Sequence, residues 1–177
     1  PRVISLGCRL NAFESELMRE HSVQSGTQDV VIINTCTVTA EAERRSRQTV
    51  RKACRDNADA EIVVTGCAAQ LDPQGFAAIS GVARVVGNAE KLEPETFKIG
   101  DHPEIDVADI MTVRETAPHL IDGFDGRARV FIQIQQGCDH RCTFCIIPFA
   151  RGPNRSVPMG AIADQIRKLV ETGFCEV

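Results

Sequence analysis

The 177-residue sequence contains no tryptophan and no tyrosine, which leaves phenylalanine as its main aromatic side chain. It has no large excess of either charge, because 20 basic and 24 acidic residues give a net charge of -4, and this excludes a histone-like basic protein. No apolar run approaches the roughly 18 residues that a membrane span needs, and no signal peptide opens the chain. Its hydrophobic content of 43% is ordinary and excludes a disordered or fibrous chain. We therefore expect a globular, cytoplasmic protein that does not contact a membrane.

Cysteine is the residue type that stands out, with eight copies. In a small secreted protein, eight cysteines could form four disulfides. This chain is long enough to bury its own core, and helical and strand patterns alternate along it. Thiols that hold a metal are therefore the better interpretation.

Hydrophobic periodicity predicts four short buried strands separated by helices. The strands are expected at residues 3–6, 30–33, 62–64 and 84–87, and the helices at residues 11–25, 40–55 and 72–79. Asn11 and Glu14 have the spacing of a capping box at the start of the first helix. Continuous apolar strands between amphipathic helices are typical of a parallel sheet with helices on its faces. We predict an α/β fold over residues 1–98, with a doubly wound parallel sheet of flavodoxin- or Rossmann-like kind.

The remainder of the chain is predicted to contain a linker and the beginning of a second domain. Residues 90–126 hold three basic and ten acidic side chains and several prolines, so residues 99–126 are interpreted as an acidic linker. A strand at 130–134, a long loop and a helix from Pro158 to Gly173 follow, as in the first βα unit of a barrel. The chain begins without Met and ends at the predicted opening of a further strand, so we expect a fragment, truncated within this domain of residues 127–177.

One set of cysteines, Cys8, Cys36 and Cys67, follows the ends of the first three predicted strands. The carboxyl ends of parallel strands lie along one edge of a sheet, where ligands bind. We therefore expect these three thiols to meet at a shared metal or cluster site. The alternative is that they are small apolar residues at strand ends, since free cysteine is often buried.

A second set, Cys138, Cys142 and Cys145, has C-x3-C-x2-C spacing directly after a predicted strand. Three thiolates on one loop suit an iron–sulfur cluster with one iron free of protein ligands. A zinc site would need a fourth ligand such as His140, which we interpret as facing solvent. Cys54 and Cys175 belong to neither set and are interpreted as structural.

The motifs around both sets resemble those of the radical S-adenosylmethionine (SAM) methylthiotransferase family, and the resemblance covers essentially the whole chain. They are LGCRLN at 6–11, NTC at 34–36, TGC at 65–67 and GCDHRCTFCIIPFARG at 137–152. The resemblance implies a radical SAM partial barrel after the first domain and two [4Fe–4S] clusters. It places the auxiliary cluster on Cys8, Cys36 and Cys67, the SAM-coordinating cluster on Cys138, Cys142 and Cys145, and Phe144 close to SAM.

The resemblance also implies an activity, the insertion of sulfur and transfer of a methyl group onto a C–H position. Residues 8–16 and 148–152 are most similar to the branch that modifies carbon-2 of threonylcarbamoyladenosine beside the tRNA anticodon. The alternative substrates are isopentenyladenosine in tRNA and a ribosomal-protein aspartate. The implied partners are the tRNA anticodon arm, an electron-donor protein and a sulfur donor. This fragment alone is expected to be inactive.

A local excess of arginine favours contact with RNA phosphates. It consists of Arg127, Arg129, Arg141, Arg151 and Arg155. Of these, Arg151 and Arg155 are our candidates for substrate contact. A rival interpretation from another class is a non-enzymatic iron–sulfur or zinc sensor module, which would bind no SAM.

Overall fold

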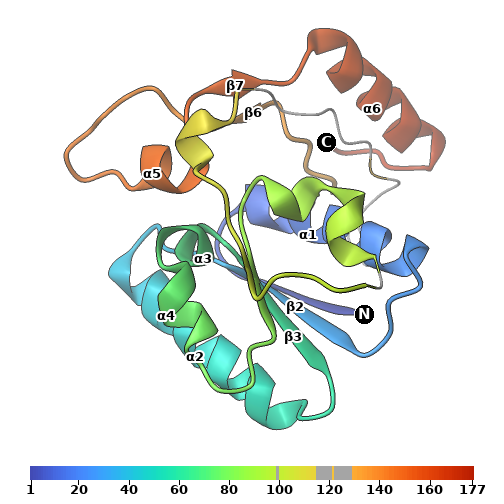
Figure 1. Ribbon diagram of the computed structural model, residues 1–177. Helices are drawn as coiled ribbons and strands as arrows, with labels where there is room; N and C mark the ends of the chain where they lie inside the picture. The colour runs from blue at the N-terminus through green and yellow to red at the C-terminus, as the bar shows by residue number, and fades with distance from the viewer. Residues whose placement is uncertain (99, 115–120, 122–128) are drawn as a thin grey trace.

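The computed structural model describes residues 1–98, 100–114, 121 and 129–177. Its centre is a parallel sheet of five strands, which confirms the predicted α/β fold (Figure 1). The strands are β1 (Arg2–Ser5), β2 (Val30–Thr35), β3 (Glu61–Gly66), β4 (Arg84–Val86) and β5 (Ile105–Asp106). Arg127 and residues 99, 115–120 and 122–126 of the predicted linker lie outside the described residues.

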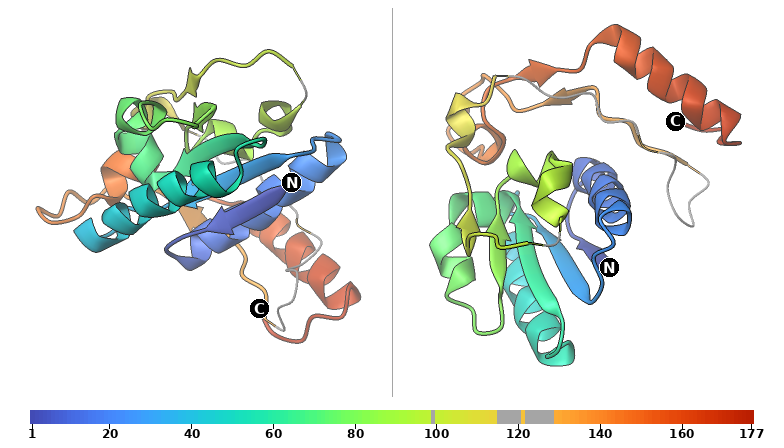
Figure 2. Two further views of the ribbon diagram at one scale, coloured as in Figure 1. Left: turned by 90° about the horizontal axis from the view of Figure 1, so that it is seen from below. Right: turned by 45° about the vertical axis from the view of Figure 1, so that its right-hand side comes forward.

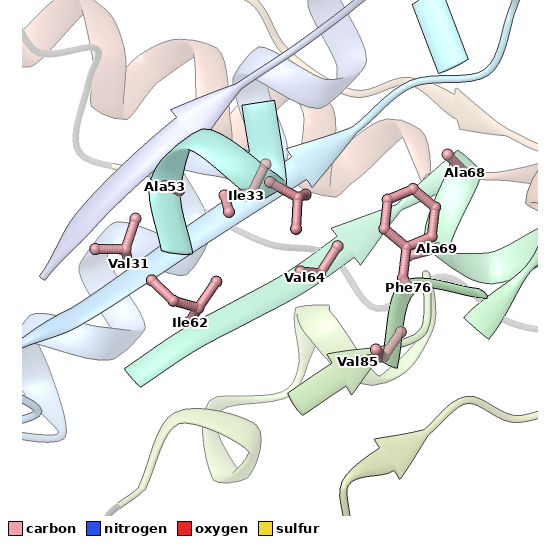
Figure 3. Close-up of a cluster of buried hydrophobic side chains, with 10 residues drawn as sticks. Val31, Ile33, Ala53, Ile62, Val64, Ala68, Ala69, Phe76 and Val85 are labelled. Carbon is pink, nitrogen blue, oxygen red and sulfur yellow. The ribbon is translucent and has the colours of Figure 1, made fainter. Parts of the chain in front are cut away.

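Helices cover both faces of the sheet, as a doubly wound arrangement requires (Figures 1 and 2). One face carries α2 (Ala40–Asp56), α3 (Cys67–Leu71) and α4 (Pro73–Ala77), and the other carries α1 (Arg9–Gln24), η1 (Glu90–Leu92) and η2 (Pro94–Phe97). Successive side chains of a strand point to opposite faces, so β2 contributes to both cores. Its Val31 and Ile33 pack with Phe76 of α4 on the first face (Figure 3), whereas Ile32 packs with Met18 of α1 on the second.

The strand order β1-β2-β3-β4-β5 follows the chain. A flavodoxin-like sheet would instead place β1 between β2 and β3. Here β2 takes the inner position, and all six of its residues are buried, whereas no residue of the shorter β1 is. The fifth strand lies within the segment that was interpreted as a linker. It has only two residues, too few to give a periodic pattern.

Residues 129–177 pack against α1, where Phe13 and Leu17 contact Val130 and Leu169. The strand predicted at 130–134 is not a regular strand. Arg129 forms an isolated parallel bridge with Glu176, and β6 (Gln135–Gln136) pairs antiparallel with β7 (Arg155–Ser156). Within the described residues no strand lies beside 130–134 to complete a ladder.

The last helix agrees with its prediction, since α6 (Met159–Glu171) begins after Pro158 and ends just before Gly173. The bridge between Arg129 and Glu176 is parallel and spans α6, which is the connection expected of a βα unit. Domain boundaries near residues 98 and 127 stay a prediction. Among the described helices, none combines the length and apolar character needed to cross a bilayer.

Candidate functional site

The three thiols that follow the first strands line one cavity of about 320 Å³. Cys8 precedes α1, Cys36 follows β2, and Cys67 is the first residue of α3. Cys36 and Cys67 are buried, whereas Cys8 is exposed. The sheet edge therefore brings these cysteines together, as the positions of the strand ends predict. Burial raises the pKa of the Cys36 thiol, and the neighbouring Cys67 and Cys8 raise it further.

Two glycine turns allow this close approach. Gly7 has a φ of 92°, and a Cβ atom at that position would lie 2.5 Å from Cys36 Sγ. Gly66 has a φ of 97°, and its Cβ would lie 2.3 Å from the carbonyl oxygen of Thr35. Real Cβ atoms do not approach other atoms so closely, and a positive φ also disfavours any other residue. The glycines before Cys8 and Cys67 are thus part of the cradle around the cavity.

The predicted capping box of Asn11 and Glu14 is wrong. Helix α1 begins at Arg9, and no side chain caps it. Asn11 is fully buried, and its Nδ2 donates to the carbonyl oxygens of Leu6 at 2.7 Å and Thr35 at 3.0 Å. These two carbonyls lie at the ends of neighbouring strands, so Asn11 satisfies sheet-edge acceptors rather than the helix N-terminus.

Glu14 belongs instead to a buried ionic network that the sequence analysis did not identify. Its carboxylate accepts hydrogen bonds from Lys91 Nζ at 2.7 Å and from Arg151 Nη2 at 3.0 Å, and Arg151 Nη1 is a further partner. The side chains of Glu14 and Lys91 are fully buried, and that of Arg151 is 3% exposed. Burial alone would raise the pKa of Glu14, but the charges of Arg151 and Lys91 outweigh it and lower the pKa to about 2.

Arg151 connects this network to the cavity. Its Nε donates to Cys67 Sγ at 3.1 Å, and its Nη2 also donates to Asn11 Oδ1 at 2.5 Å. Burial would lower the pKa of Arg151, but Glu14 and Cys67 raise it above its usual value, so the guanidinium is charged. A permanent cation therefore lies against one of the three candidate ligands.

Arg151 and Arg155, the candidates for contact with an RNA substrate, both lie inside the described fold, and their contact with RNA stays a prediction. Arg151 is 3% exposed and Arg155 is 5% exposed. The Nη2 of Arg155 donates to Gln136 Oε1 at 3.2 Å and to the carbonyl oxygen of Arg151 at 3.0 Å. Neither guanidinium is presented at the surface to meet a phosphate, because both are used inside the fold.

The second set of cysteines lies on the loop between β6 and α5 (Ile147–Arg151), which extends away from the sheet in Figure 1. Cys142 is exposed, whereas Cys138 and Cys145 are half-buried. The Cys145 amide donates to the carbonyl oxygen of Cys142 at 3.0 Å, which forms a turn between these two cysteines. Gly137 and Ile146, the residues on either side of this set, line the cavity of the first set. The residues that flank the second set therefore border this cavity, whereas its three thiols are not part of the cavity lining.

The remaining predicted residues lie outside this cavity. The ring of Phe144 is 91% exposed, and His140 is exposed as expected. Cys54 packs partly against the sheet core, and Cys175 is exposed near the end of the chain.

Three thiols around one cavity are the type of ligand set that an iron–sulfur cluster uses. Within the described ranges, no three His, Cys, Asp or Glu side chains converge as a mononuclear metal site requires. In a [4Fe–4S] cluster each thiolate binds a different iron, so the thiols are spaced more widely than around one ion. Three soft sulfur ligands, a mostly apolar wall and an adjacent cation fit an anionic iron–sulfur cluster on Cys8, Cys36 and Cys67.

The chain is similar to known proteins over nearly its whole length. Residues 2–87 match the family described as "Uncharacterized protein family UPF0004". The chain is 51% identical over 175 residues to the threonylcarbamoyladenosine tRNA methylthiotransferase MtaB of Rickettsia prowazekii, covering 99% of this chain and 41% of that protein. The corresponding protein of Aquifex aeolicus is 39% identical, with 98% and 45% covered. A tRNA-2-methylthio-N(6)-dimethylallyladenosine synthase of Sorangium cellulosum is 28% identical, with 99% and 40% covered.

A solved structure has a fold similar to that of this chain. It is the radical S-adenosylmethionine methyltransferase TsrM of Kitasatospora setae, with a TM-score of 0.51 and 17% sequence identity over 89% of this chain and 37% of that one. The chain spans less than half the length of the curated relatives named above. The cysteine motifs, the matched residues and the identity to these relatives lead to one conclusion: the chain belongs to the methylthiotransferase family.

Proposed function

We propose that this protein is a radical SAM enzyme that methylthiolates tRNA, with carbon-2 of threonylcarbamoyladenosine beside the anticodon as its target. The observation that supports this most is the cavity at the sheet edge. Cys8, Cys36 and Cys67 line it, and the residues that flank the second set border it. Sulfur insertion requires a radical source and a sulfur carrier at one substrate atom, and this arrangement provides a place for both.

The side chains of this chain have separable tasks in that reaction. The two sets of thiolates hold the clusters, which when bound would supply the electron that cleaves SAM and the site at which sulfur is held. The mostly apolar cavity wall, which includes Leu10, Val38 and Ile147, limits the access of water to a reactive centre. Asn11 and Arg151 fix the strand ends and Cys67 from the protein side.

Metal content tests the two-cluster assignment. Anaerobic reconstitution of the purified chain should yield about eight irons per chain, from two [4Fe–4S] clusters. A Cys8→Ala, Cys36→Ala double variant should retain about four irons, and the Cys138→Ala, Cys142→Ala, Cys145→Ala variant should do the same. Cys54→Ala is the matched control, since Cys54 belongs to neither set. Zinc in place of iron would favour the sensor module, and an unchanged iron count in either cluster variant would refute the assignment.

The choice of substrate rests on relatives. Proteins named for threonylcarbamoyladenosine are up to 51% identical to this chain, whereas the dimethylallyladenosine synthase is 28% identical. Nucleoside analysis of tRNA from a strain lacking the gene should show loss of methylthiolated threonylcarbamoyladenosine. Methylthiolated isopentenyladenosine should be retained, and the wild-type gene should restore the loss, whereas the Cys36→Ala gene should not. Loss of the isopentenyl form instead would move the protein to that branch.

The remaining partners are an electron-donor protein and a sulfur donor, and a tRNA substrate implies a cytoplasmic location.

A further inference from the structure

We propose that Arg151 is a positioning residue that raises the reduction potential of the auxiliary cluster, by directing an N–H group at the sulfur of Cys67 and placing a buried positive charge beside it. This inference rests on the proposed function, because it requires a cluster on Cys8, Cys36 and Cys67. It assigns Arg151 to the cluster rather than to RNA.

The orientation of the guanidinium is fixed on every side. Its Nη1 and Nη2 donate to Glu14, and Nη2 also donates to Asn11, so both terminal nitrogens are held by partners other than the thiol. Only Nε is left to meet Cys67 Sγ, at 3.1 Å. Arginine presents its donors in a rigid planar fork, so anchoring the terminal nitrogens determines where Nε points. Glu14 and Asn11 thus aim the N–H group at the sulfur.

The position of the backbone that carries Arg151 is also fixed. Asn88 Nδ2 donates to the carbonyl oxygen of Ala150 at 2.7 Å and lies 3.9 Å from Cys67 Sγ. Asn88 follows β4, whereas Ala150 and Arg151 belong to α5. A strand end of the sheet therefore holds α5 at the residue before the arginine.

The charge beside Cys67 has the sign that an anionic cluster needs. Arg151 contacts Cys67 Sγ, and the single carboxylate of Glu14 is shared between Arg151 and Lys91. A buried cation is costly unless an opposite charge compensates it, and a cluster on Cys67 would supply further negative charge. Three thiolates outweigh the charge of an oxidised [4Fe–4S] core, and reduction adds another negative charge. The buried cation stabilises the reduced form more than the oxidised form.

Hydrogen bonds to the cluster sulfurs are among the factors that set the reduction potential of an iron–sulfur centre. Like the buried cation, a hydrogen bond to Cys67 stabilises the more negative reduced form and so raises the reduction potential. The donor in this case is carried by the segment that follows the second cysteine set. The potential of the first cluster therefore depends on how this later segment docks on the sheet.

The test uses the chain with Cys138, Cys142 and Cys145 replaced by alanine, so that only the auxiliary cluster forms. Redox titration of the reconstituted protein, followed by electron paramagnetic resonance, gives the midpoint potential, and iron content is measured on the same sample. Arg151→Lys keeps the charge but loses the fixed N–H group, and Arg151→Gln also loses the charge. Arg155→Lys is the matched control, because Arg155 is equally buried but forms no hydrogen bond with Cys67 in the described structure.

We expect all variants to retain the iron content of the parent protein. The midpoint potential should become more negative in Arg151→Lys and more negative still in Arg151→Gln, and it should stay unchanged in Arg155→Lys. A parent protein without iron would refute the proposed function, on which this inference rests. Normal iron content with the same potential in both Arg151 variants would refute the role of Arg151 alone. If Arg151→Gln fails to fold, the comparison of Arg151→Lys with Arg155→Lys still decides the matter.

Discussion

The two cysteine sets occupy contrasting parts of the molecule. Cys36 and Cys67 are buried at the ends of sheet strands, next to side chains that hydrogen-bond to one another inside the fold. Cys138, Cys142 and Cys145 lie on an extended loop, where Cys142 is exposed (Figure 1). The positions of the first set are determined by the sheet, whereas those of the second follow from short spacing along the chain. The first site should therefore be organised before a cluster binds.

The largest effect is expected for Glu14→Gln, which tests whether the first site is organised by its buried network. This change leaves Lys91 and Arg151 buried without their carboxylate, and breaking such a pair costs about 3–5 kcal/mol. Urea unfolding of the metal-free chain should show a loss of that size. Glu41→Gln is the control, because the exposed pair of Glu41 with Arg44 should contribute no more than about 1 kcal/mol. Equal effects of the two changes would mean that the first site is not organised by its network.

The next largest effect on stability is expected at the turn before Cys67. Gly66→Ala should destabilise the chain by about 3 kcal/mol, because it combines backbone strain with a clash against Thr35. Gly26→Ala is the control, since Gly26 also has a positive φ of 69° but no atom within 4 Å. That change should lower the free energy of unfolding by only about 1 kcal/mol, the cost of a positive φ for a residue with a Cβ atom. Thermal or urea unfolding compares the two, and similar losses would remove the evidence for a tightly packed cradle.

The stability of the metal-free chain should also depend on pH through Glu14. Its pKa is about 2 in the folded state, below the ordinary value of 4.5, so the stabilisation is complete above pH 4.5 and is lost as the pH falls toward 2. Between these pH values, the free energy of unfolding of the wild-type chain should fall by about 1.4 kcal/mol per pH unit more than that of Glu14→Gln. Urea unfolding of both proteins from pH 5 to pH 3 measures this difference, and parallel curves would contradict it.

The smallest test compares the thiols directly. In metal-free protein, exposed Cys142 should react with iodoacetamide at least about tenfold faster than Cys36, whose burial raises its pKa and blocks access. Peptide mass spectrometry over time gives both rates. Exposed Cys175, which belongs to neither set, should react as Cys142 does. Rapid modification of Cys36 would mean that the first site opens in the absence of metal.

The contrast also explains which features could be predicted from the sequence. The runs in β2 and β3 are long and apolar, so their ends, and hence Cys36 and Cys67, could be located by periodicity. The ionic network could not, because Glu14 lies 77 residues from Lys91 and 137 from Arg151. Nothing in the local sequence around these three residues distinguishes them from ordinary charged surface residues. Only the fold shows that they pair with one another in the interior.

Two other differences between the predicted and the observed strands have a similar origin. The two residues of β5 are held by pairing with β4 rather than by an apolar pattern of their own. Residues 130–134 do have such a pattern, but a strand also needs a continuous partner. Among the described residues, backbone hydrogen bonds from this segment reach only Glu176 at one end and Val157 at the other. Periodicity reports which side chains prefer burial, and it does not report which backbone will be available for pairing.

The side chain of Arg151 has a consequence for dividing the chain into working parts. The sheet is nearly complete at residue 98, and a cut there would appear to release a self-contained unit with all three thiols of the first set. Such a unit would retain Glu14 and Lys91 but would lose the guanidinium that contacts Cys67 and the helix that closes the cavity beside it. The shortest contiguous piece that contains the whole first site therefore extends through Arg151, and includes all three thiols of the second.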